Sequence, residues 1–214
     1  MATGIGMKMT IAMISKKFGS VRDISTDTLE EWLKNHSISG KVAGINTPTG
    51  NQSSPIDNLV TGSSSGTQTQ EVTNAQRKLV ILDCRPEEEF VISHLEGSVR
   101  VDYDKDVKEI IQTLPEHLHT VENLANTDIV CYCSLGYRSS VVADKFQNFL
   151  KENSGCLPGG SESPAAVNLE GSLFKWANEG RHMVDMDGRQ TIFAHPYNVV
   201  YGKLLKHELR KQTL

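Results

Sequence analysis

Cysteine, aromatic residues and long apolar runs are all scarce in this sequence. Only 4 of its 214 residues are cysteine, and 6% are aromatic. Four irregularly spaced cysteines are too few for a disulfide-stapled secreted scaffold, so we expect reduced thiols. No apolar run approaches the roughly 18 residues that a membrane span needs. The sequence therefore predicts a soluble protein that does not insert into a membrane.

Clustered positive charge is missing as well. The chain has 22 Lys and Arg against 26 Asp and Glu, which gives a formal net charge of −4. Neutralising the phosphates of a nucleic acid requires clustered basic residues, so we do not expect nucleic acid as the main ligand. A small molecule or a protein is the expected partner.

The remaining composition is that of an ordinary globular protein. Hydrophobic residues make up 38% of the chain, and 17 residues are glycine. These values exclude a collagen, a coiled coil and a wholly disordered chain. The length suits one domain with a full core or two small domains.

The first 22 residues carry four basic side chains and no acidic one, namely Lys8, Lys16, Lys17 and Arg22. Organellar transit peptides share this bias. The segment has only one arginine and two serines, however, and its longest apolar stretch, Ile11 to Ile14, is too short for a secretory signal. We expect a cytoplasmic protein, with mitochondrial targeting as the alternative.

Apolar runs alternate with helical patterns from residue 24 onward. Lys78 to Asp83 reads KLVILD, a continuous apolar run typical of a strand buried on both faces of a parallel sheet. Pro86 follows and suits the first turn of a helix. Further strands are predicted near residue 24 and at 98–103, 128–133 and 167–169. Helices are predicted at 26–35, 107–114, 139–151 and 172–178. Ser25 or Thr26 is the expected N-cap of the first of these helices. This order predicts a parallel α/β sheet whose reactive loops lie at the carboxyl ends of its strands.

Two segments interrupt this pattern, at about 39–73 and 153–166. Both are rich in small and polar residues and poor in large apolar ones. Such segments gain too little burial to offset the entropy of ordering, so we expect flexible insertions. A docking or modification segment is the alternative for the first of them.

The stretch CSLGYRS, from Cys133 to Ser139, carries the clearest chemical signal. It lies between a predicted buried strand and an amphipathic helix, where backbone N–H groups converge and lower the pKa of a thiol. Gly136 lets the loop curl tightly, and Arg138 adds a fixed positive charge. We therefore predict that Cys133 is a nucleophile; a buried free cysteine in a tight turn is the alternative.

Four blocks of the sequence resemble the rhodanese-like (thiosulfate sulfurtransferase) family of the single-domain type. They are, in order, LVILDCRPEEEF, SHLEGS, IVCYCSLGYRSSVVA and VNLEGSLFKWANEGRHMV. The resemblance implies an α/β fold with a central, mostly parallel five-stranded sheet flanked by helices on both faces. It implies that Cys133 is catalytic and forms a persulfide. The implied substrate-binding loop is Ser134, Leu135, Gly136, Tyr137, Arg138 and Ser139.

The resemblance also divides the chain. It implies an N-terminal extension at 1–22, a rhodanese-like domain at 23–190 and a C-terminal extension at 191–214. The apolar residues Val200, Leu204 and Leu205 suggest a helix that packs back on the domain. His195 and Tyr197 could reach the site, although capping the core is the preferred interpretation. The donor specificity stays open because Ser93, Glu96, Arg100 and Leu135 depart from the usual family pattern.

Three further residues are candidates for supporting the loop: Asp83, Arg85 and His94. Asp83 ends a strand and could pair with Arg138 or Arg85; an exposed surface acid is the alternative. His94 is expected to be a hydrogen-bonded turn residue rather than a proton shuttle.

The other cysteines receive structural interpretations. Cys131 lies two residues before Cys133 and is expected to be a buried strand residue, with a resolving thiol as the alternative. Cys156 lies in the second insertion, where nothing fixes its geometry. A zinc site lacks a C-x-x-C pair, and we expect no metal and no other cofactor.

The predicted activity is transfer of a sulfane sulfur from a donor such as thiosulfate to cyanide, a thiol or a protein. Two alternatives remain. A dual-specificity-type phosphatase would use Cys-x5-Arg, whereas Cys133 to Arg138 forms the tighter Cys-x4-Arg. A non-catalytic rhodanese-like module would use the same fold only to bind a partner.

Overall fold

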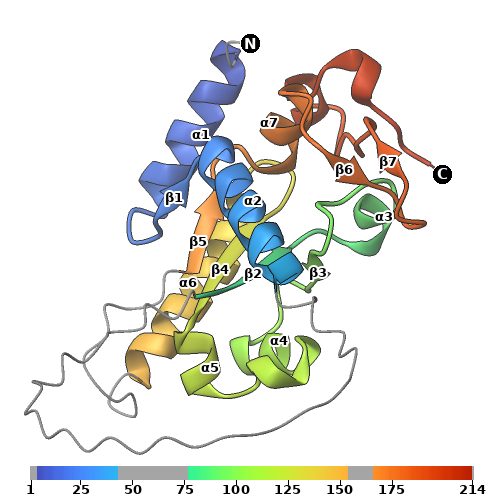
Figure 1. Cartoon of the computed structure of the whole chain (residues 1–214). Coiled ribbons are helices and arrows are strands. Elements are labelled where there is room, and N and C mark those ends of the chain that lie inside the picture. Colours follow the sequence, from blue (N-terminus) through green and yellow to red (C-terminus); the bar gives the residue numbers. More distant parts are fainter. Residues whose placement is uncertain (1–3, 43–76, 154–165, 214) are drawn as a thin grey trace, which may run out of the picture.

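A five-stranded sheet forms the centre of the molecule (Figure 1). The computed structural model describes residues 4–42, 77–153 and 166–213. All neighbouring strands are parallel, and the strand order is β1-β5-β4-β2-β3. The bounds are β1 Asp23–Ile24, β2 Lys78–Asp83, β3 Val99–Arg100, β4 Thr127–Tyr132 and β5 Ala166–Leu169. The predicted α/β fold is thereby confirmed.

Helices cover both faces of this sheet. The longer ones are α1 Ile5–Lys17, α2 Thr26–Val42, α4 Val107–Thr113, α6 Tyr137–Glu152 and α7 Ser172–Asn178. Shorter elements are α3 Glu87–Phe90, α5 Val121–Ala125, the 3-10 turns η1 Glu116–Leu118, η3 Tyr201–Leu204 and η4 His207–Leu209, and the hairpin β6 Met183–Val184 with β7 Gln190–Thr191. Among these α-helices, the predicted ones begin or end within a few residues of their expected positions, whereas α1 and α5 were not predicted.

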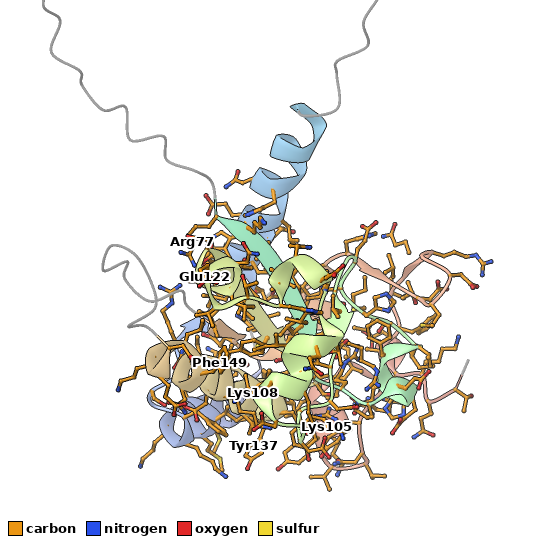
Figure 2. The ribbon with its side chains drawn as sticks, turned by 90° about the horizontal axis from the view of Figure 1, so that it is seen from below. Arg77, Lys105, Lys108, Glu122, Tyr137 and Phe149 are labelled. Carbon is orange, nitrogen blue, oxygen red and sulfur yellow. The ribbon has the colours of Figure 1, made fainter. Side chains whose placement is uncertain are left out.

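The two sides of the sheet have separate hydrophobic cores. Helices α1, α2 and α7 pack over one face, and α4, α5 and α6 pack over the other. Along β4 the side chains alternate, so that Val130 and Tyr132 lie in the first core while Ile129 and Cys131 lie in the second. Figure 2 shows the second side from below, with Lys108 on α4 and Phe149 on α6.

The start of α2 follows the sequence prediction. The Ser25 hydroxyl accepts a hydrogen bond from the backbone N–H of Thr28 at 3.0 Å, so Ser25 is the N-cap. Leu29 is fully buried one turn later. The helix reaches Val42, and the predicted insertion at 39–73 otherwise falls outside the described residues, as does most of the one at 153–166.

The predicted strand at 98–103 is shorter than expected. Only Val99 and Arg100 pair with β2, opposite Leu82 and Asp83. The Val101 N–H still donates to the Asp83 carbonyl, at 2.9 Å. Because β2 ends at Asp83, the chain beyond this point has no strand with which to continue the ladder.

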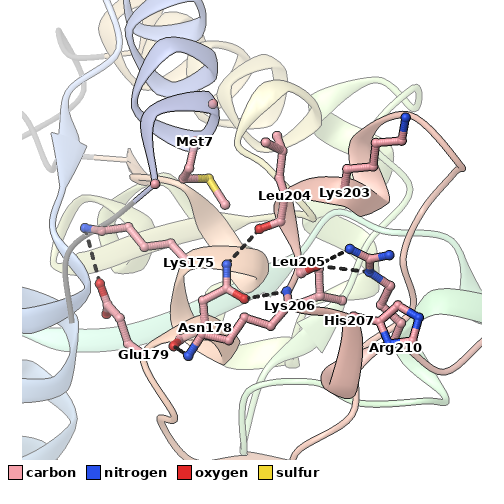
Figure 3. A pocket seen from close by; sticks show the side chains of 12 residues that line it. Met7, Lys175, Asn178, Glu179, Lys203, Leu204, Leu205, Lys206, His207 and Arg210 are labelled. Atoms are coloured by element: carbon pink, nitrogen blue, oxygen red, sulfur yellow. Dashed lines mark hydrogen bonds and ion pairs between the residues drawn. The ribbon is translucent and has the colours of Figure 1, made fainter.

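The C-terminal extension is not the α-helix that the sequence suggests. It contains the short 3-10 turns η3 and η4, and its backbone is held by α7 (Figure 3). The Asn178 side chain donates to the Leu204 carbonyl at 2.8 Å and accepts from the Lys206 N–H at 2.9 Å. Leu205 is fully buried, but Val200 is 71% exposed. Bonds to α7 therefore replace the intrahelical bonds that an α-helix would make.

The N-terminal extension forms α1, which lies against the domain and buries Met7. Within residues 4–42, 77–153 and 166–213, no helix is both long and apolar enough to cross a bilayer.

Candidate active site

The loop between β4 and α6 turns within four residues. Gly136 adopts φ of 117°, a conformation that strains any residue with a Cβ atom. A Cβ atom there would also lie 3.3 Å from the Asn168 side chain. Glycine is therefore required for the loop to close over Cys133, as the sequence indicates.

The Cys133 thiol lies at the bottom of this loop and is 2% exposed. Its Sγ accepts a hydrogen bond from the Gly136 N–H at 3.1 Å. Burial raises the pKa of the thiol. The charge of Arg138 and hydrogen bonds from Ser139 and the Leu135 backbone lower the pKa by more than burial raises it, so the pKa of Cys133 falls below the ordinary value. The loop therefore favours the thiolate form of Cys133.

Arg138 is fixed by a carboxylate that the sequence analysis did not assign to the site. Its guanidinium donates to both oxygens of Glu89, at 2.9 and 3.2 Å, and to the Ser134 hydroxyl at 2.9 Å. Ser134 in turn donates to Glu89, which is 2% exposed. The sequence offers only three consecutive acids at 87–89, and nothing in that run distinguishes the one that faces inward.

The N-terminus of α7 holds the loop from the opposite side. The Ser172 hydroxyl accepts from the Cys133 N–H at 3.2 Å, and the Leu173 N–H donates to the Cys133 carbonyl at 3.0 Å. Ser172 has φ of 50°, an uncommon conformation for a non-glycine residue. Such strain persists where surrounding contacts fix the backbone, and here it places the hydroxyl against the loop that holds Cys133. Ser172 could not be recognised as a site residue from the sequence, because it looks like an ordinary helix start.

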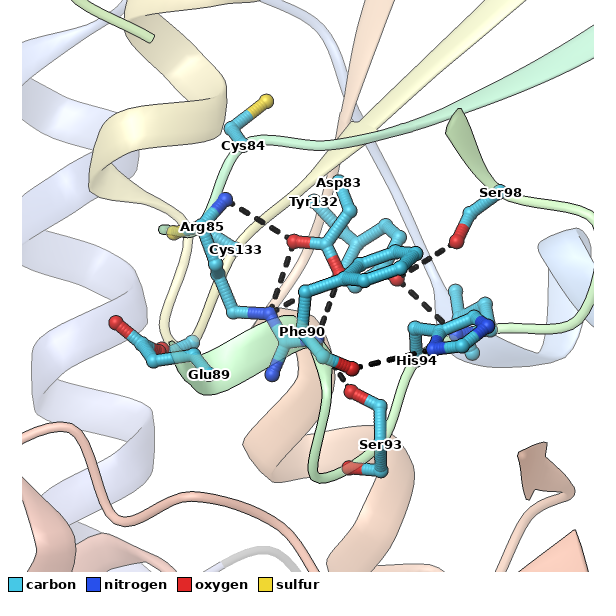
Figure 4. A network of polar contacts seen from close by, with 12 residues as sticks. Asp83, Cys84, Arg85, Glu89, Phe90, Ser93, His94, Ser98, Tyr132 and Cys133 are labelled. Atoms are coloured by element: carbon cyan, nitrogen blue, oxygen red, sulfur yellow. Dashed lines mark hydrogen bonds and ion pairs between the residues drawn. The ribbon is translucent and has the colours of Figure 1, made fainter. Parts of the chain in front are cut away.

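Asp83 pairs with Arg85 and not with Arg138. The two side chains are fully buried and their Nη2 and Oδ2 atoms lie 2.6 Å apart. Arg85 also donates to the Ser93 carbonyl at 2.6 Å (Figure 4). Of the two partners that the sequence left open for Asp83, the structure selects Arg85, and the pair braces the carboxyl end of β2 beside the loop.

Comparison with known proteins agrees with this geometry. The model of the rhodanese-like domain matches residues 68–179, which is more than half of the chain and includes the loop. The chain belongs to the rhodanese-like domain family. A search of curated protein sequences finds no match.

Three solved structures show a distant likeness to this rhodanese-like chain. The match to a Bacillus halodurans protein covers 55% of this chain and 72% of that chain, with 16% sequence identity and a TM-score of 0.37. A thiosulfate sulfurtransferase from Pseudomonas aeruginosa is 13% identical with a TM-score of 0.43, over 86% of this chain and 23% of that protein. A Rhodopseudomonas palustris protein of unknown function, named a possible tyrosine phosphatase, is 16% identical with a TM-score of 0.35, over 85% and 97% of the two chains. None of the three bears on the activity of this chain.

The rhodanese loop opens into a pocket of about 350 Å³. Its floor is Cys133 with neighbouring loop residues, and its walls come from both ends of the chain. The wall residues are Thr10, Met13, Ile14 and Lys17 from α1 and Tyr197 and Tyr201 from the C-terminal extension. The α1 wall was not predicted from the sequence. For the C-terminal wall, the sequence offered contact between Tyr197 and the site only as the alternative to capping the core.

Tyr197 reaches the site, which corrects the expectation that it caps the core. Its ring lies 4.8 Å from the Arg138 guanidinium carbon, a cation–π arrangement. The residue has φ of 62°, a strained conformation that is typical of functional positions. His195 does not line the pocket; its Nδ1 accepts the Tyr197 N–H at 3.1 Å and so supports the turn.

A chain of polar contacts joins the rhodanese loop to α1. Ser139 donates to the side-chain oxygen of Asn168 at 2.7 Å, and the Asn168 amide donates to Asp23 at 2.7 Å. Ser15 of α1 donates to the other oxygen of Asp23. Asn168 is 2% exposed, so the position of the loop depends on the edge strand β1 and on the N-terminal helix.

His94 has the contacts of a turn residue. Its ring stacks on Phe90 with centroids 4.0 Å apart, and its Nδ1 lies 3.2 Å from the Phe90 carbonyl oxygen. Its backbone bridges to Val184. These contacts fit the interpretation of His94 as a structural residue.

The two other cysteines that the structure describes, Cys84 and Cys131, belong to the core. Cys84 and Cys131 are fully buried on the α4 and α6 side. Burial, with smaller contributions from Cys131, Cys133 and Asp83, raises the pKa of Cys84 well above its usual value. Cys156 lies outside the described residues, among which no group of three His, Cys, Asp or Glu side chains could hold a metal ion.

Proposed function

We propose that this chain is a sulfurtransferase that carries a sulfane sulfur as a persulfide on Cys133. The observation that supports the proposal best is the thiol itself. It is buried, its pKa is lowered, and it receives the Gly136 N–H at 3.1 Å from a loop closed by an arginine. The arginine and the N–H donor favour an anion at Sγ, and together with the other donors of the loop they outweigh the opposing effect of burial.

The first half of the reaction moves one sulfur atom and leaves the total charge unchanged. The Cys133 thiolate attacks the outer sulfur of thiosulfate, the bond between the two sulfurs of the donor breaks, and sulfite departs with the bonding electron pair. The product on the enzyme is the Cys133 persulfide anion. N–H groups that face this anion stabilise it in the way that an oxyanion hole stabilises a developing charge.

The second half returns the thiolate. A thiophilic acceptor such as cyanide, a thiol or a protein thiol attacks the terminal sulfur of the persulfide and leaves with it. Arg138 favours the anionic forms of Cys133 throughout, and Glu89 fixes its guanidinium in a bidentate pair. The displacement needs only the thiolate and its surrounding donors.

The loop length favours sulfur transfer over phosphate hydrolysis. Cys133 and Arg138 enclose four residues, and the Gly136 N–H already contacts Sγ. A ring this tight suits a single sulfur atom, whereas a tetrahedral phosphate requires a wider one.

The test is to incubate the purified protein with thiosulfate and to measure its mass and the release of sulfite, then of thiocyanate after cyanide is added. We expect one added sulfur, mapped to Cys133, and turnover that Cys133→Ser abolishes. Cys131→Ala is the matched control and should retain turnover, because this thiol lies in the core. Turnover in Cys133→Ser would contradict the proposal and place the chemistry on another cysteine. An unmodified Cys133 without turnover in the presence of donor would contradict it as well and favour a non-catalytic partner-binding module. Hydrolysis of an aryl phosphate faster than sulfur transfer would favour the phosphatase.

A further inference from the structure

The pocket above Cys133 is larger and more apolar than a thiosulfate ion requires. Its volume of about 350 Å³ lies at the lower end of the range for pockets that bind organic molecules. Met13 is 71% exposed at the pocket, and Tyr197 and Tyr201 are 43% and 44% exposed. Grouped exposed apolar side chains are uncommon on a soluble protein and mark a binding surface.

The two tyrosines form a continuous aromatic wall. Their ring centroids lie 6.1 Å apart with an interplanar angle of 30°. The Tyr197 ring is fixed above the Arg138 guanidinium at 4.8 Å. An apolar or aromatic group bound here would therefore lie beside the charge that stabilises the sulfur anion.

A second cation lies on the opposite wall of the pocket. Lys17 Nζ donates to the Tyr137 hydroxyl at 2.9 Å and lies 4.6 Å from the centre of that ring. With Arg138, which is paired with Glu89, it places two cationic side chains at the pocket, and none of the described residues that line the pocket is acidic. This arrangement complements a ligand that combines an anionic head with an apolar body.

Both walls are anchored to the domain and to each other. Asn178 holds the backbone of the C-terminal extension at Leu204 and Lys206 (Figure 3). A Cβ atom at Gly6 of α1 would lie 3.0 Å from the Leu204 side chain, so α1 and the extension approach closely. Prearranged walls bind a matching ligand at a lower entropic cost than mobile loops do.

Resting on the proposed function, we propose that the sulfur donor is an organic sulfane compound whose anionic head faces Lys17 and Arg138 and whose apolar body, about the size of one aromatic ring, packs against Met13, Tyr197 and Tyr201. An aryl thiosulfonate is the simplest member of this class. Its outer sulfur passes to the Cys133 thiolate, the sulfur–sulfur bond of the donor breaks, and an aryl sulfinate leaves with the bonding pair.

The first test compares three donors, benzenethiosulfonate, methanethiosulfonate and thiosulfate, by kcat/KM with cyanide as the acceptor. Each value is divided by the rate at which the same donor reacts with a free thiol, which removes intrinsic reactivity. We expect the corrected value for benzenethiosulfonate to exceed that for methanethiosulfonate by about tenfold. Met13→Ala and Tyr201→Ala should each reduce this preference for the aryl donor about threefold to tenfold.

Matched controls for these variants lie away from the pocket. Met186→Ala and Tyr103→Ala remove side chains of the same type that are 53% and 38% exposed, and they should leave the preference unchanged. Lys17→Gln should lower kcat/KM for all three anionic donors by a similar factor. Equal corrected values for the aryl and methyl donors, or an aryl preference that survives both wall variants, would overturn the proposal.

A second measurement does not depend on turnover. Benzenesulfonate, which has no transferable sulfur, should protect Cys133 from iodoacetamide at about one tenth of the methanesulfonate concentration, and Tyr201→Ala should remove the difference. Transfer from thiosulfate without aryl-selective protection would overturn this inference and leave the proposed function intact. Aryl-selective protection without transfer from any donor would support the pocket's specificity and overturn the proposed function.

Discussion

At the scale of single residues, a competition between burial and charge decides the reactivity of Cys133. Burial alone would keep the thiol protonated, as it does for Cys84. At Cys133, Arg138 and the hydrogen bonds of the loop outweigh burial and lower the pKa. Two buried thiols about fifty residues apart in the sequence thus have opposite shifts, and the difference lies in which backbone donors and charges face them.

The first prediction concerns this charge. Cys133 should react with iodoacetamide with a pH midpoint below about 8.5, the value of an unperturbed thiol. Arg138→Ala should raise the midpoint by about one pH unit, so that labelling at pH 6 slows roughly tenfold, because the thiolate loses its nearest positive charge. Peptide mapping of the alkylated protein against pH measures both effects.

The control for this experiment is Arg100→Ala, which removes a guanidinium from the partly exposed pair with Asp102. It should leave the midpoint in place. Cys131 should be labelled only after denaturation. An unchanged midpoint in Arg138→Ala, or equal labelling of Cys131 and Cys133 in the folded protein, would show that the loop does not activate the thiol.

The buried pair of Asp83 and Arg85 gives a prediction about stability. Asp83→Asn keeps the shape of the side chain but leaves the fully buried Arg85 charge without its counter-ion. We expect the free energy of unfolding to fall by about 3 kcal/mol, measured by urea denaturation. Asp102→Asn, in the partly exposed pair with Arg100, should cost less than about 1 kcal/mol. Similar losses in the two variants would show that water reaches the buried pair.

At the scale of elements, the parallel strands and most of the helices between them could be predicted because each carries its own pattern. The run KLVILD and the apolar stripe of α6 need no tertiary information. Helix α1 could not be predicted. Its apolar residues are spread around the helix, only Met7 is buried, and its first turn has no acidic residue. Its position depends on contacts with the domain, such as the bond from Ser15 to Asp23, and sequence periodicity does not contain that information.

The residues of the candidate site also fall into those that could be predicted from the sequence and those that could not. The loop residues from Cys133 to Ser139 could be identified because they adjoin one another in the sequence. Glu89, Asn168 and Ser172 come from three other elements and meet the loop only in the folded chain. Each is a common polar residue in an ordinary local context, so no local signal distinguishes it.

The spacing of the loop between β4 and α6 gives a third prediction. Insertion of a glycine after Leu135 moves the Gly136 N–H away from Sγ and lengthens the distance from Arg138 to the thiol. We expect sulfur transfer to fall about tenfold or more and the alkylation midpoint of Cys133 to rise, because the donors no longer converge on one atom. The measurements are thiocyanate formation and labelling against pH.

The matched control is a glycine inserted after Asp187, in the exposed turn between β6 and β7, which should leave both quantities unchanged. A longer loop that transfers sulfur at the original rate would show that the convergence of N–H groups is not required. The inserted variant may also be assayed with an aryl phosphate, for which the wider ring is the better match.

At the scale of the whole molecule, the two ends of the chain complete a site whose centre lies in the family's own segment. The match to the rhodanese-like family spans residues 68–179, whereas the pocket walls come from α1 and from Tyr197 and Tyr201. Both ends are tied to the loop through side chains, Ser15 through Asp23 and Asn168, and Tyr197 through Arg138. The family's segment therefore holds the thiol and its loop, and the segments outside it shape the entrance to the thiol.

Asn168 occupies the middle of the link between α1 and the loop, and it gives the last prediction. Asn168→Asp places a second carboxyl group next to Asp23 at a position that is 2% exposed. Burial and the neighbouring charge raise the pKa of the introduced carboxyl in the folded state above about 3.9, its value in the unfolded chain. The unfolded chain then loses the proton first as the pH rises, so the destabilisation grows between that value and the raised pKa. We expect a loss of about 3 kcal/mol in the free energy of unfolding at pH 8 and a much smaller loss at pH 4, measured by urea denaturation at both pH values.

Asn148→Asp is the control for this prediction. Asn148 donates to Asp144 on the exposed surface of α6, and the same pair of carboxylates there remains solvated. A pH-independent loss in Asn168→Asp, or one no larger than in Asn148→Asp, would mean that the link from α1 to the Cys133 loop is open to water and does not fix the loop.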